Sequence, residues 1–159
     1  MWKKDGTKLT GYYGTWRGQE VELWSLRPYE GTLTIVKDGE QSLIVEGGVE
    51  VVFNPSVGTP FAYSLEVPAD EVTNRHKVRV KGRLGPGRNL MIMAEDADGN
   101  LSVESIDHMA ATYKRQLINN HGFEPFSKNE PLEHVSVAGW IPADRVSDIS
   151  VEVIPFSND

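Results

Sequence analysis

The sequence predicts a mainly β fold with one α-helix, built as two tandem related units. A repeated phrase is the first observation: Val67-Pro68-Ala69-Asp70-Glu71-Val72 returns as Ile141-Pro142-Ala143-Asp144-Arg145-Val146, 141 − 67 = 74 residues later. The second is that apolar alternation broken by Gly, Pro, Asn and Asp runs through most of the chain, which is typical of short strands. The third is a single segment with helical spacing near 107–121. We expect a first β unit over 10–77 and a second over 78–156, which carries the helix.

The first unit is expected to consist of short strands joined by tight turns. β-rich segments stand at 12–26, 32–36, 42–53 and 61–67. The run Arg27-Pro28-Tyr29-Glu30-Gly31 supplies the turn signals between the first two segments. Pro68 then suits the first position of a one-turn helix, because its missing amide proton costs nothing there.

The second unit opens with alternating Val78 and Val80 and bends at the glycines of Gly85-Pro86-Gly87. A hairpin follows, and its tip, Asp96-Ala97-Asp98-Gly99-Asn100, is a clear turn signal. The last strands of the chain are expected around 135–141 and 149–156. The repeated phrase at 141–146 stands between these two strands and, like its first copy, comes just before a β-like run.

The helix follows the hairpin of the second unit. Ser105 or Asp107 can cap its start. Apolar residues then recur at four-residue spacing along one face: Met109, Tyr113 and Leu117. Gly122, with Phe123 behind it, supplies a left-handed stop. We therefore predict a helix near 107–121 whose apolar stripe covers one end of the second unit.

Composition limits the class of protein. The 159 residues, 39% hydrophobic and 25% charged, suit one compact domain or two very small ones. The net charge of −7 argues against nucleic-acid binding, which needs a basic surface, and leaves either simple solubility or a basic protein partner. No apolar run is long enough to cross a membrane, and the chain has no cysteine. We expect a cytoplasmic protein with no membrane or nucleic-acid partner, and the oligomeric state stays open.

Catalytic chemistry has little support in the sequence. The four histidines show no metal-ligand spacing and stand near different predicted elements. Asp107-His108 suggests an acid/base pair, but a helix cap followed by a first-turn residue explains it better. Asp70 and Glu71 lie on the repeated structural turn, and no serine has a nucleophile-elbow pattern. We predict no enzyme, no catalytic residue, no metal site and no cofactor.

Binding residues are a better prospect, because large aromatic and guanidinium side chains crowd the first thirty residues. Such side chains dominate protein interfaces. Trp16 and Trp24 fall on predicted strands and are expected to fill the first core. Arg27, Tyr29 and Glu30 lie in a turn between strands, where large side chains are more exposed. They are the predicted contact residues, together with the acidic hairpin tip formed by Asp96 and Asp98.

The end of the chain supplies a first resemblance. Gly139-Trp140-Ile141-Pro142-Ala143-Asp144-Arg145-Val146 resembles the end of an SH3 domain, where a glycine, an apolar residue, a proline and a 3₁₀ turn lead into the last strand. The resemblance implies an SH3-like barrel for each unit. A continuous curled sheet built from the same repeats is the alternative.

A second resemblance covers most of the chain. Trp16-Arg17-Gly18-Gln19-Glu20, Gly122-Phe123 and Trp140-Ile141-Pro142-Ala143-Asp144-Arg145-Val146 are similar to motifs of bacterial immunity proteins encoded beside secreted polymorphic toxins. The resemblance implies a protein that binds its cognate toxin and blocks the toxin's active site. NAD-glycohydrolase toxins like the tuberculosis necrotizing toxin are one such toxin class.

The resulting hypothesis is a non-enzymatic immunity protein, or antitoxin, that docks on a toxin through Arg27, Tyr29 and Glu30, helped by Asp96 and Asp98. A preformed loop would favour affinity because little of it must be ordered on binding. Two alternatives stay open. One is an SH3-like adaptor for a peptide or cell-wall ligand, which needs an exposed aromatic groove. The other is an enzyme whose site is assembled from scattered residues, which needs a deep pocket with perturbed titratable groups.

Overall fold

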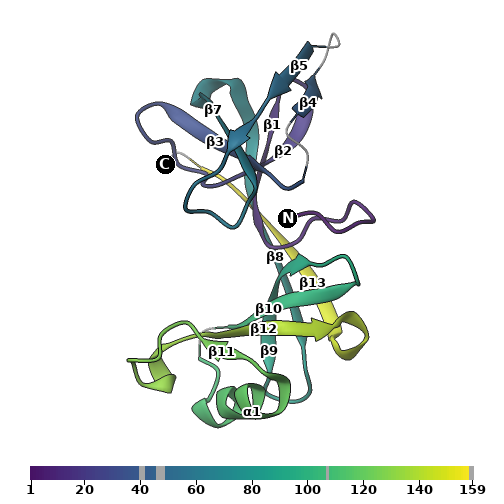
Figure 1. Ribbon diagram of the computed structural model, residues 1–159, viewed down its shortest axis with the longest axis vertical. Coiled ribbons are helices and arrows are strands. Elements are labelled where there is room, and N and C mark those ends of the chain that lie inside the picture. The colour runs from purple at the N-terminus through teal and green to yellow at the C-terminus, as the bar shows by residue number, and fades with distance from the viewer. Residues whose placement is uncertain (40–41, 46–48, 107, 158–159) are drawn as a thin grey trace. The chain divides into compact units, whose positions relative to one another are not determined.

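The computed structural model describes residues 1–39, 42–45, 49–106 and 108–157 (Figure 1). The fold is mainly β, and the described residues contain one α-helix, α1 (Ala111–His121), beside three 3₁₀ turns. The expected mainly β class with a single helix is therefore confirmed. Within the described part of the chain, no helix is long and apolar enough to cross a membrane.

The chain divides into two compact units. We call Gly11–Val78 with Val153–Asp159 the first unit, and Met1–Thr10 with Arg79–Glu152 the second unit. The ranges predicted from the sequence for two units are 10–77 and 78–156. Two strands contribute residues to both units: β8 (Val72–Arg83) and β13 (Ser147–Pro155).

The first unit is an antiparallel meander. Its strands, each hydrogen-bonded to the next, follow the order β8, β1 (Gly11–Trp16), β2 (Gln19–Leu23), β3 (Thr32–Lys37), β7 (Tyr63–Pro68) and β6 (Asn54–Pro55). Between β3 and β7 the chain also forms a separate hairpin of β4 (Ser42–Val45) and β5 (Val49–Val52). The 3₁₀ turn η1 (Ala69–Glu71) joins β7 to β8. Strand β8 then pairs with β1, so the last strand of the unit in sequence lies beside its first.

The core of the first unit follows from strand alternation, which sends every second side chain inward. Its buried members are Trp16, Val21, Leu23, Leu33, Ile35, Phe53, Val67 and Val72. The placement of Trp16 in this core is as predicted. Gly14 lets the strands pack closely, because a Cβ atom there would stand 2.8 Å from a methyl group of Val72.

The second unit is also an antiparallel meander. Its order is β13, β8, β9 (Asn89–Glu95), β10 (Asn100–Ser105), β12 (Val137–Pro142) and β11 (Glu124–Pro125). The 3₁₀ turn η2 (Leu132–His134) precedes β12, and η3 (Ala143–Arg145) joins β12 to β13. Buried residues on these strands include Val80, Leu90, Ile92, Leu101, Val103, Val137 and Ile141.

The two 3₁₀ turns of the repeated phrase have the same local geometry. Pro68 has φ −57° and ψ 134°, and Pro142 has φ −58° and ψ 138°. In each turn the amide of the following valine donates to the carbonyl of the alanine three residues earlier. A residue with positive φ stands two positions after that valine in both cases: Asn74 at 52° and Asp148 at 53°. Asn and Asp tolerate this conformation better than other side chains.

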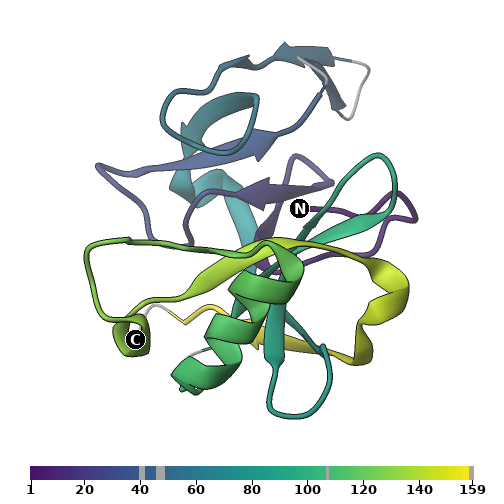
Figure 2. The same cartoon turned by 60° about the horizontal axis from the view of Figure 1, so that its bottom comes forward.

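Helix α1 packs beside β12 (Figure 2) and begins later than expected. Its N-cap is Ala110, which makes no side-chain capping bond. The prediction that Ser105 caps the helix is wrong, because the Ser105 hydroxyl accepts the Val137 amide at 3.0 Å and so joins β10 to β12 instead. The other predicted cap, Asp107, lies outside the described residues.

The C-terminal end of α1 is as predicted. Gly122 has φ 70° and ψ 22°, and the Phe123 amide donates to the Leu117 carbonyl at 3.3 Å. Phe123 is buried and lies over Gly139, where a Cβ atom would stand 2.4 Å from its ring. Lys114, on the same helix, is also buried, and its ammonium donates to the carbonyls of Leu132 at 2.9 Å and Val135 at 2.7 Å. These contacts fasten α1 to the segment around η2.

Candidate functional site

The loop between β2 and β3 presents the three predicted contact residues of the first unit. Arg27, Tyr29 and Glu30 are all exposed, and Tyr29 keeps 77% of its surface accessible. A tyrosine that protrudes this far from a short loop contributes little to the core. It is instead a rigid, amphipathic side chain that a partner can bury.

Hydrogen bonds fix the backbone of this loop. The amides of Tyr29 and Thr32 donate to each other's carbonyls at 3.0 and 3.1 Å, and the Thr32 hydroxyl also donates to the Tyr29 carbonyl at 3.0 Å. At the loop's start, the Arg27 amide donates to the Ser25 hydroxyl at 3.2 Å. Glu30 and Gly31 turn the chain with φ of 51° and 79°. The loop is therefore preformed, so binding would order little of it.

Trp24 belongs to the same exposed surface, contrary to the prediction that it fills the core. Val21 and Leu23 point inward on β2, so strand alternation turns Trp24 outward, and 46% of its surface is accessible. Its ring meets Phe61 edge to face, with centroids 6.3 Å apart. We call Trp24, Arg27, Tyr29 and Glu30 the aromatic loop.

The base of the aromatic loop is tied to strand β8. The Arg75 guanidinium donates to the Leu26 carbonyl at 2.8 Å and stacks over the Phe156 ring at 4.8 Å. The Phe156 amide in turn donates to the Arg75 carbonyl at 3.0 Å. The loop thus stands on a strand of the sheet rather than on another loop, which favours a precise presentation of its side chains.

The two predicted acidic residues of the second unit have different roles. Asp96 accepts three hydrogen bonds inside the β9–β10 turn: from the Asp98 amide at 2.9 Å, and from the backbone and side-chain nitrogens of Asn100 at 2.8 and 3.1 Å. Loss of hydration alone would raise the pKa of Asp96, but the bonds from Asn100 and Asp98 bring its pKa below the ordinary value. Asp96 therefore builds the turn. Asp98 is exposed.

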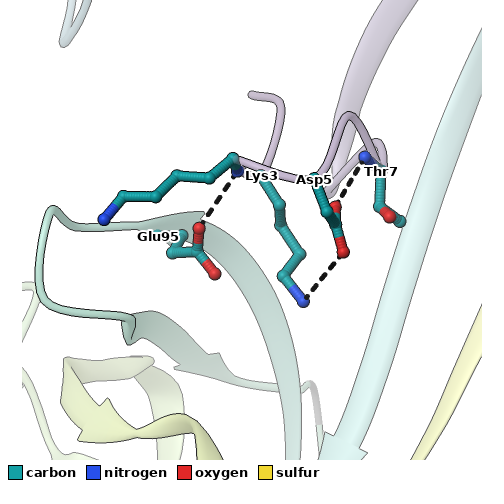
Figure 3. A network of polar contacts seen from close by, with 5 residues as sticks. Lys3, Asp5, Thr7 and Glu95 are labelled. Atoms are coloured by element: carbon teal, nitrogen blue, oxygen red, sulfur yellow. Dashed lines mark hydrogen bonds and ion pairs between the residues drawn. The ribbon is translucent and has the colours of Figure 1, made fainter.

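The N-terminal segment lies against the same hairpin (Figure 3). The Lys4 amide donates to the Glu95 carboxylate at 3.1 Å, and the Lys4 ammonium donates to the Ala97 carbonyl. Asp5 accepts the Thr7 amide at 2.9 Å and stands 3.9 Å from the Lys3 ammonium. Lys4 thus borders the acidic tip. The tip and the aromatic loop belong to different units, so we treat them as separate surfaces.

The second unit also contains a cleft that the sequence analysis missed. Its volume is about 850 Å³. It is lined by parts of β8, β9 and β13, by the segment before α1 and by the first turn of α1: Lys81, Gly82, Arg83, Gly87, Asn89, Ile106, His108, Met109, Ala110, Tyr113, Asp148 and Ser150. These residues come from three separate parts of the sequence, 81–89, 106–113 and 148–150, and form no local motif.

One wall of the cleft is held by contacts between α1 and the β8–β9 turn. The Tyr113 ring lies against Gly87, where a Cβ atom would stand 2.5 Å from it. The Arg88 guanidinium covers the same ring at 5.7 Å and donates to the Gln116 side chain. His108 was expected in the first turn of the helix, but it precedes the helix and has φ 76°. Its exposed side chain therefore lies on the cleft and not on the helix.

Among the described residues, no group of three or more His, Asp or Glu side chains is arranged to hold a metal ion. No protein-family profile, no curated protein and no solved structure matches the chain. The chemistry of the aromatic loop and of the cleft therefore has to carry the functional argument.

Proposed function

We propose that this protein is a non-enzymatic immunity protein that binds a cognate secreted toxin through the aromatic loop and occludes the toxin's substrate cleft. The observation that carries the proposal is Tyr29, 77% exposed on a loop whose backbone is fixed by hydrogen bonds to Thr32. The class of partner comes from the resemblance to immunity proteins of polymorphic toxins, with NAD-glycohydrolase toxins as one candidate.

The energetics of association support a binding role for this loop. Tyrosine, tryptophan and arginine are the residue types that contribute most at interfaces, and Trp24, Tyr29 and Arg27 provide one of each. Rigid aromatic side chains on a preformed loop lose little conformational freedom when they bind. The chain's net charge of −7 would speed its encounter with a basic partner.

We also propose that the two units are tandem copies of one SH3-like module. The matching strand orders support this, since β8-β1-β2-β3-β7-β6 corresponds to β13-β8-β9-β10-β12-β11. The registers agree as well: Thr32 pairs with Pro68 as Asn100 pairs with Pro142. In each unit, a 3₁₀ turn delivers the chain to a last strand that pairs with the first, as in an SH3 domain.

Close packing at two glycines supports the same duplication. A Cβ atom on Gly14 would meet Val72 and Leu23, and one on Gly82 would meet Val146 and Ile92. Val72 and Val146 are the last residues of the two copies of the repeated phrase. A glycine packed against the same residue of that phrase in both units is expected of two copies and not of two unrelated units.

An adaptor role for a peptide is the second candidate, and the exposed Trp24, whose ring contacts the half-buried Phe61, favours it. Aromatic side chains on the surface of SH3-like modules suit extended, proline-rich peptides. The two candidates differ in the partner, since an adaptor binds isolated peptides, whereas an immunity protein binds a folded enzyme. We place either activity in the cytoplasm.

The test is capture of partners from a lysate of the native organism, followed by co-expression of the best secreted-enzyme hit with this protein. We expect the wild type to relieve the toxicity of that enzyme, and Tyr29→Ala combined with Glu30→Lys to lose protection. Phe126→Ala removes an aromatic side chain that is 61% exposed on the second unit, and it should leave protection intact.

Two outcomes would count against the proposal. Unchanged protection by the Tyr29→Ala, Glu30→Lys variant would exclude the aromatic loop as the toxin-binding surface. Capture of proline-rich peptides with no toxic enzyme would favour the adaptor. Thermal unfolding of each variant, compared with that of the wild type, separates a lost contact from a lost fold.

A further inference from the structure

We propose that the cleft of the second unit binds a small organic phosphate, with the phosphate at its basic rim and an apolar or planar body on its floor. The cleft belongs to a different unit from the aromatic loop, so this inference does not depend on the proposed immunity function. Its volume of about 850 Å³ lies within the range of small-molecule sites.

The charge of the cleft is opposite to that of the protein. The chain has a net charge of −7, yet the charged side chains that line the cleft are Lys81, Arg83 and Asp148, joined by His108. Among the described residues of the lining, Asp148 is therefore the one carboxylate, and basic groups outnumber it. A concave surface with excess positive charge concentrates anions, and in an acidic protein this excess is local to the cleft.

The basic side chains have capacity for a ligand. Among the residues that the structure describes, the Lys81 ammonium has no hydrogen-bond or ion-pair partner, while its backbone pairs with Met91. Arg83 stands 3.5 Å from Asp148, with both side chains more than half exposed, at 57% and 69%. An exposed ion pair of this kind contributes little, so Arg83 can turn to a stronger acceptor at small cost. Arginine and lysine together suit phosphate, since the guanidinium donates in a fork and the ammonium supplies a point charge.

The start of α1 adds donors to the same cleft. Its N-cap Ala110 lines the cleft and gives no side-chain acceptor to the first amides of the helix, and the first turn contains no acidic residue. Within the first turn itself, no side chain therefore compensates the positive end of the helix dipole. Phosphate oxygens accept from several donors at once, which a carboxylate with two oxygens does less well. This combination favours phosphate as the anionic group.

The floor of the cleft suits an organic body. Met109 and the Tyr113 ring line it beside Ile106, and the ring itself is held in place by Gly87 and by the Arg88 guanidinium. A planar or apolar group can stack on this surface, while free phosphate would leave it exposed to water. The structure therefore points to a phosphate attached to an organic group, with the free ion as the competing source.

Calorimetric titration of the full-length protein with phenyl phosphate and with inorganic phosphate distinguishes these sources. We expect phenyl phosphate to bind more tightly. The double variant Lys81→Ala, Arg83→Ala should weaken it by about tenfold or more, because charge-assisted hydrogen bonds are lost. Lys77→Ala removes one positive charge from the same strand, outside the cleft, and should leave the affinity within about twofold of the wild type, whereas Lys81→Ala alone should already weaken binding by more than that.

Ala110→Asp tests the site without threatening the fold. Ala110 has φ −62° and ψ 142°, the extended conformation of a capping residue, so an aspartate there should cap α1 and place a negative charge in the cleft. We expect unchanged or higher thermal stability together with about tenfold weaker binding of phenyl phosphate.

Three results would overturn the inference. If neither phenyl phosphate nor inorganic phosphate bound at millimolar concentration, a phosphate site would be excluded. Equal affinities for the two probes would show that the cleft recognises free phosphate and not an organic phosphate. Equal losses of affinity in Lys77→Ala and in the cleft variants would reduce the binding to general attraction by surface charge.

Discussion

The two units share an order of strands and differ in the connection from β3 to β7 in the first unit and from β10 to β12 in the second. In the first unit this connection holds the β4–β5 hairpin and the short strand β6. In the second unit it holds α1, the short strand β11 and η2. The shared strands contain the buried residues that pack each unit. The differing connections produce different surfaces, and in the second unit α1 forms one wall of the cleft.

Even within these connections, one element is common to both units. Phe53 and Phe123 are each 2% exposed, and each precedes a two-residue strand that ends in proline. Strand β6 pairs with β7, with Pro55 opposite Tyr63, and β11 pairs with β12, with Pro125 opposite Val137. Both connections therefore contain this element, and they differ in the chain before it and in η2, which follows it in the second unit.

Removing these two phenylalanines should produce the largest effects. We expect Phe53→Ala and Phe123→Ala each to lower the free energy of unfolding by about 3–5 kcal/mol, because each leaves a cavity in a closely packed core. Urea unfolding measures the loss. Phe126→Ala, at an exposed position, should change stability by no more than about 0.5 kcal/mol. If one variant lost several kcal/mol of unfolding free energy and the other lost almost none, the two phenylalanines would not be equivalent core residues.

The two close-packed glycines should give the next largest effects. A Cβ atom at Gly82 would stand 2.4 Å from Val146, and one at Gly14 would stand 2.8 Å from Val72. We expect Gly82→Ala to cost more than Gly14→Ala, both within about 1–3 kcal/mol, since neither stiff valine can rotate away freely. Adding Val146→Ala to Gly82→Ala should recover part of the loss. Additive losses in that double variant would contradict the steric explanation.

Lys114 provides a contact that the first unit lacks. Its ammonium satisfies two backbone carbonyls, those of Leu132 and Val135, from a buried position on α1. Lys114→Met keeps an apolar stem but leaves both carbonyls without this donor, so we expect a loss of about 1–3 kcal/mol. Hydrogen exchange should show the weakening around η2. Arg115→Met, at the exposed neighbouring position, is the matched control. Equal stability of the two variants would show that water replaces the ammonium at no cost.

The repeated phrase, the end of the helix and the exposed loop were predictable because each depends on local chemistry. Proline before a 3₁₀ turn, glycine at a helix C-terminus and turn residues between strands act over a few positions. The start of α1 was not predictable in this way. Ser105 looks like a cap in sequence, but its hydroxyl binds the amide of Val137, a residue that only the sheet brings near.

The cleft and the orientation of Trp24 were not predictable from the sequence for related reasons. Trp24 directly follows β2, and which face it joins depends on the register of that strand. The cleft joins Lys81, Tyr113 and Asp148 from separate segments, and no local pattern connects them. The Phe-x-Pro pair at 53–55 and 123–125 was visible in the sequence, but three residues are too short a repeat to stand out before the strands are paired.

Glu104 should produce the smallest effect and the sharpest contrast between the units. It lies on β10 opposite Met91, where the first unit has the buried Val36 opposite Glu22. Burial raises the pKa of Glu104 above its ordinary value of 4.5. A carboxyl whose pKa is raised on folding binds its proton more tightly in the folded state, so its charged form opposes folding. At a pH below the pKa that Glu104 has in the unfolded chain, this destabilisation is absent. At a pH above its pKa in the folded protein, the destabilisation reaches its full size.

Glu104→Gln should therefore be more stable than the wild type at neutral pH, and this difference should disappear as the pH falls below about 4. Urea unfolding of both proteins across this range measures the difference directly. Glu66→Gln, on the exposed face of β7, is the control for removing one negative charge from an acidic chain. The same gain in both variants would assign the effect to net charge. A gain in Glu104→Gln alone would identify the half-buried carboxylate as the cost that the second unit bears where the first unit has a valine.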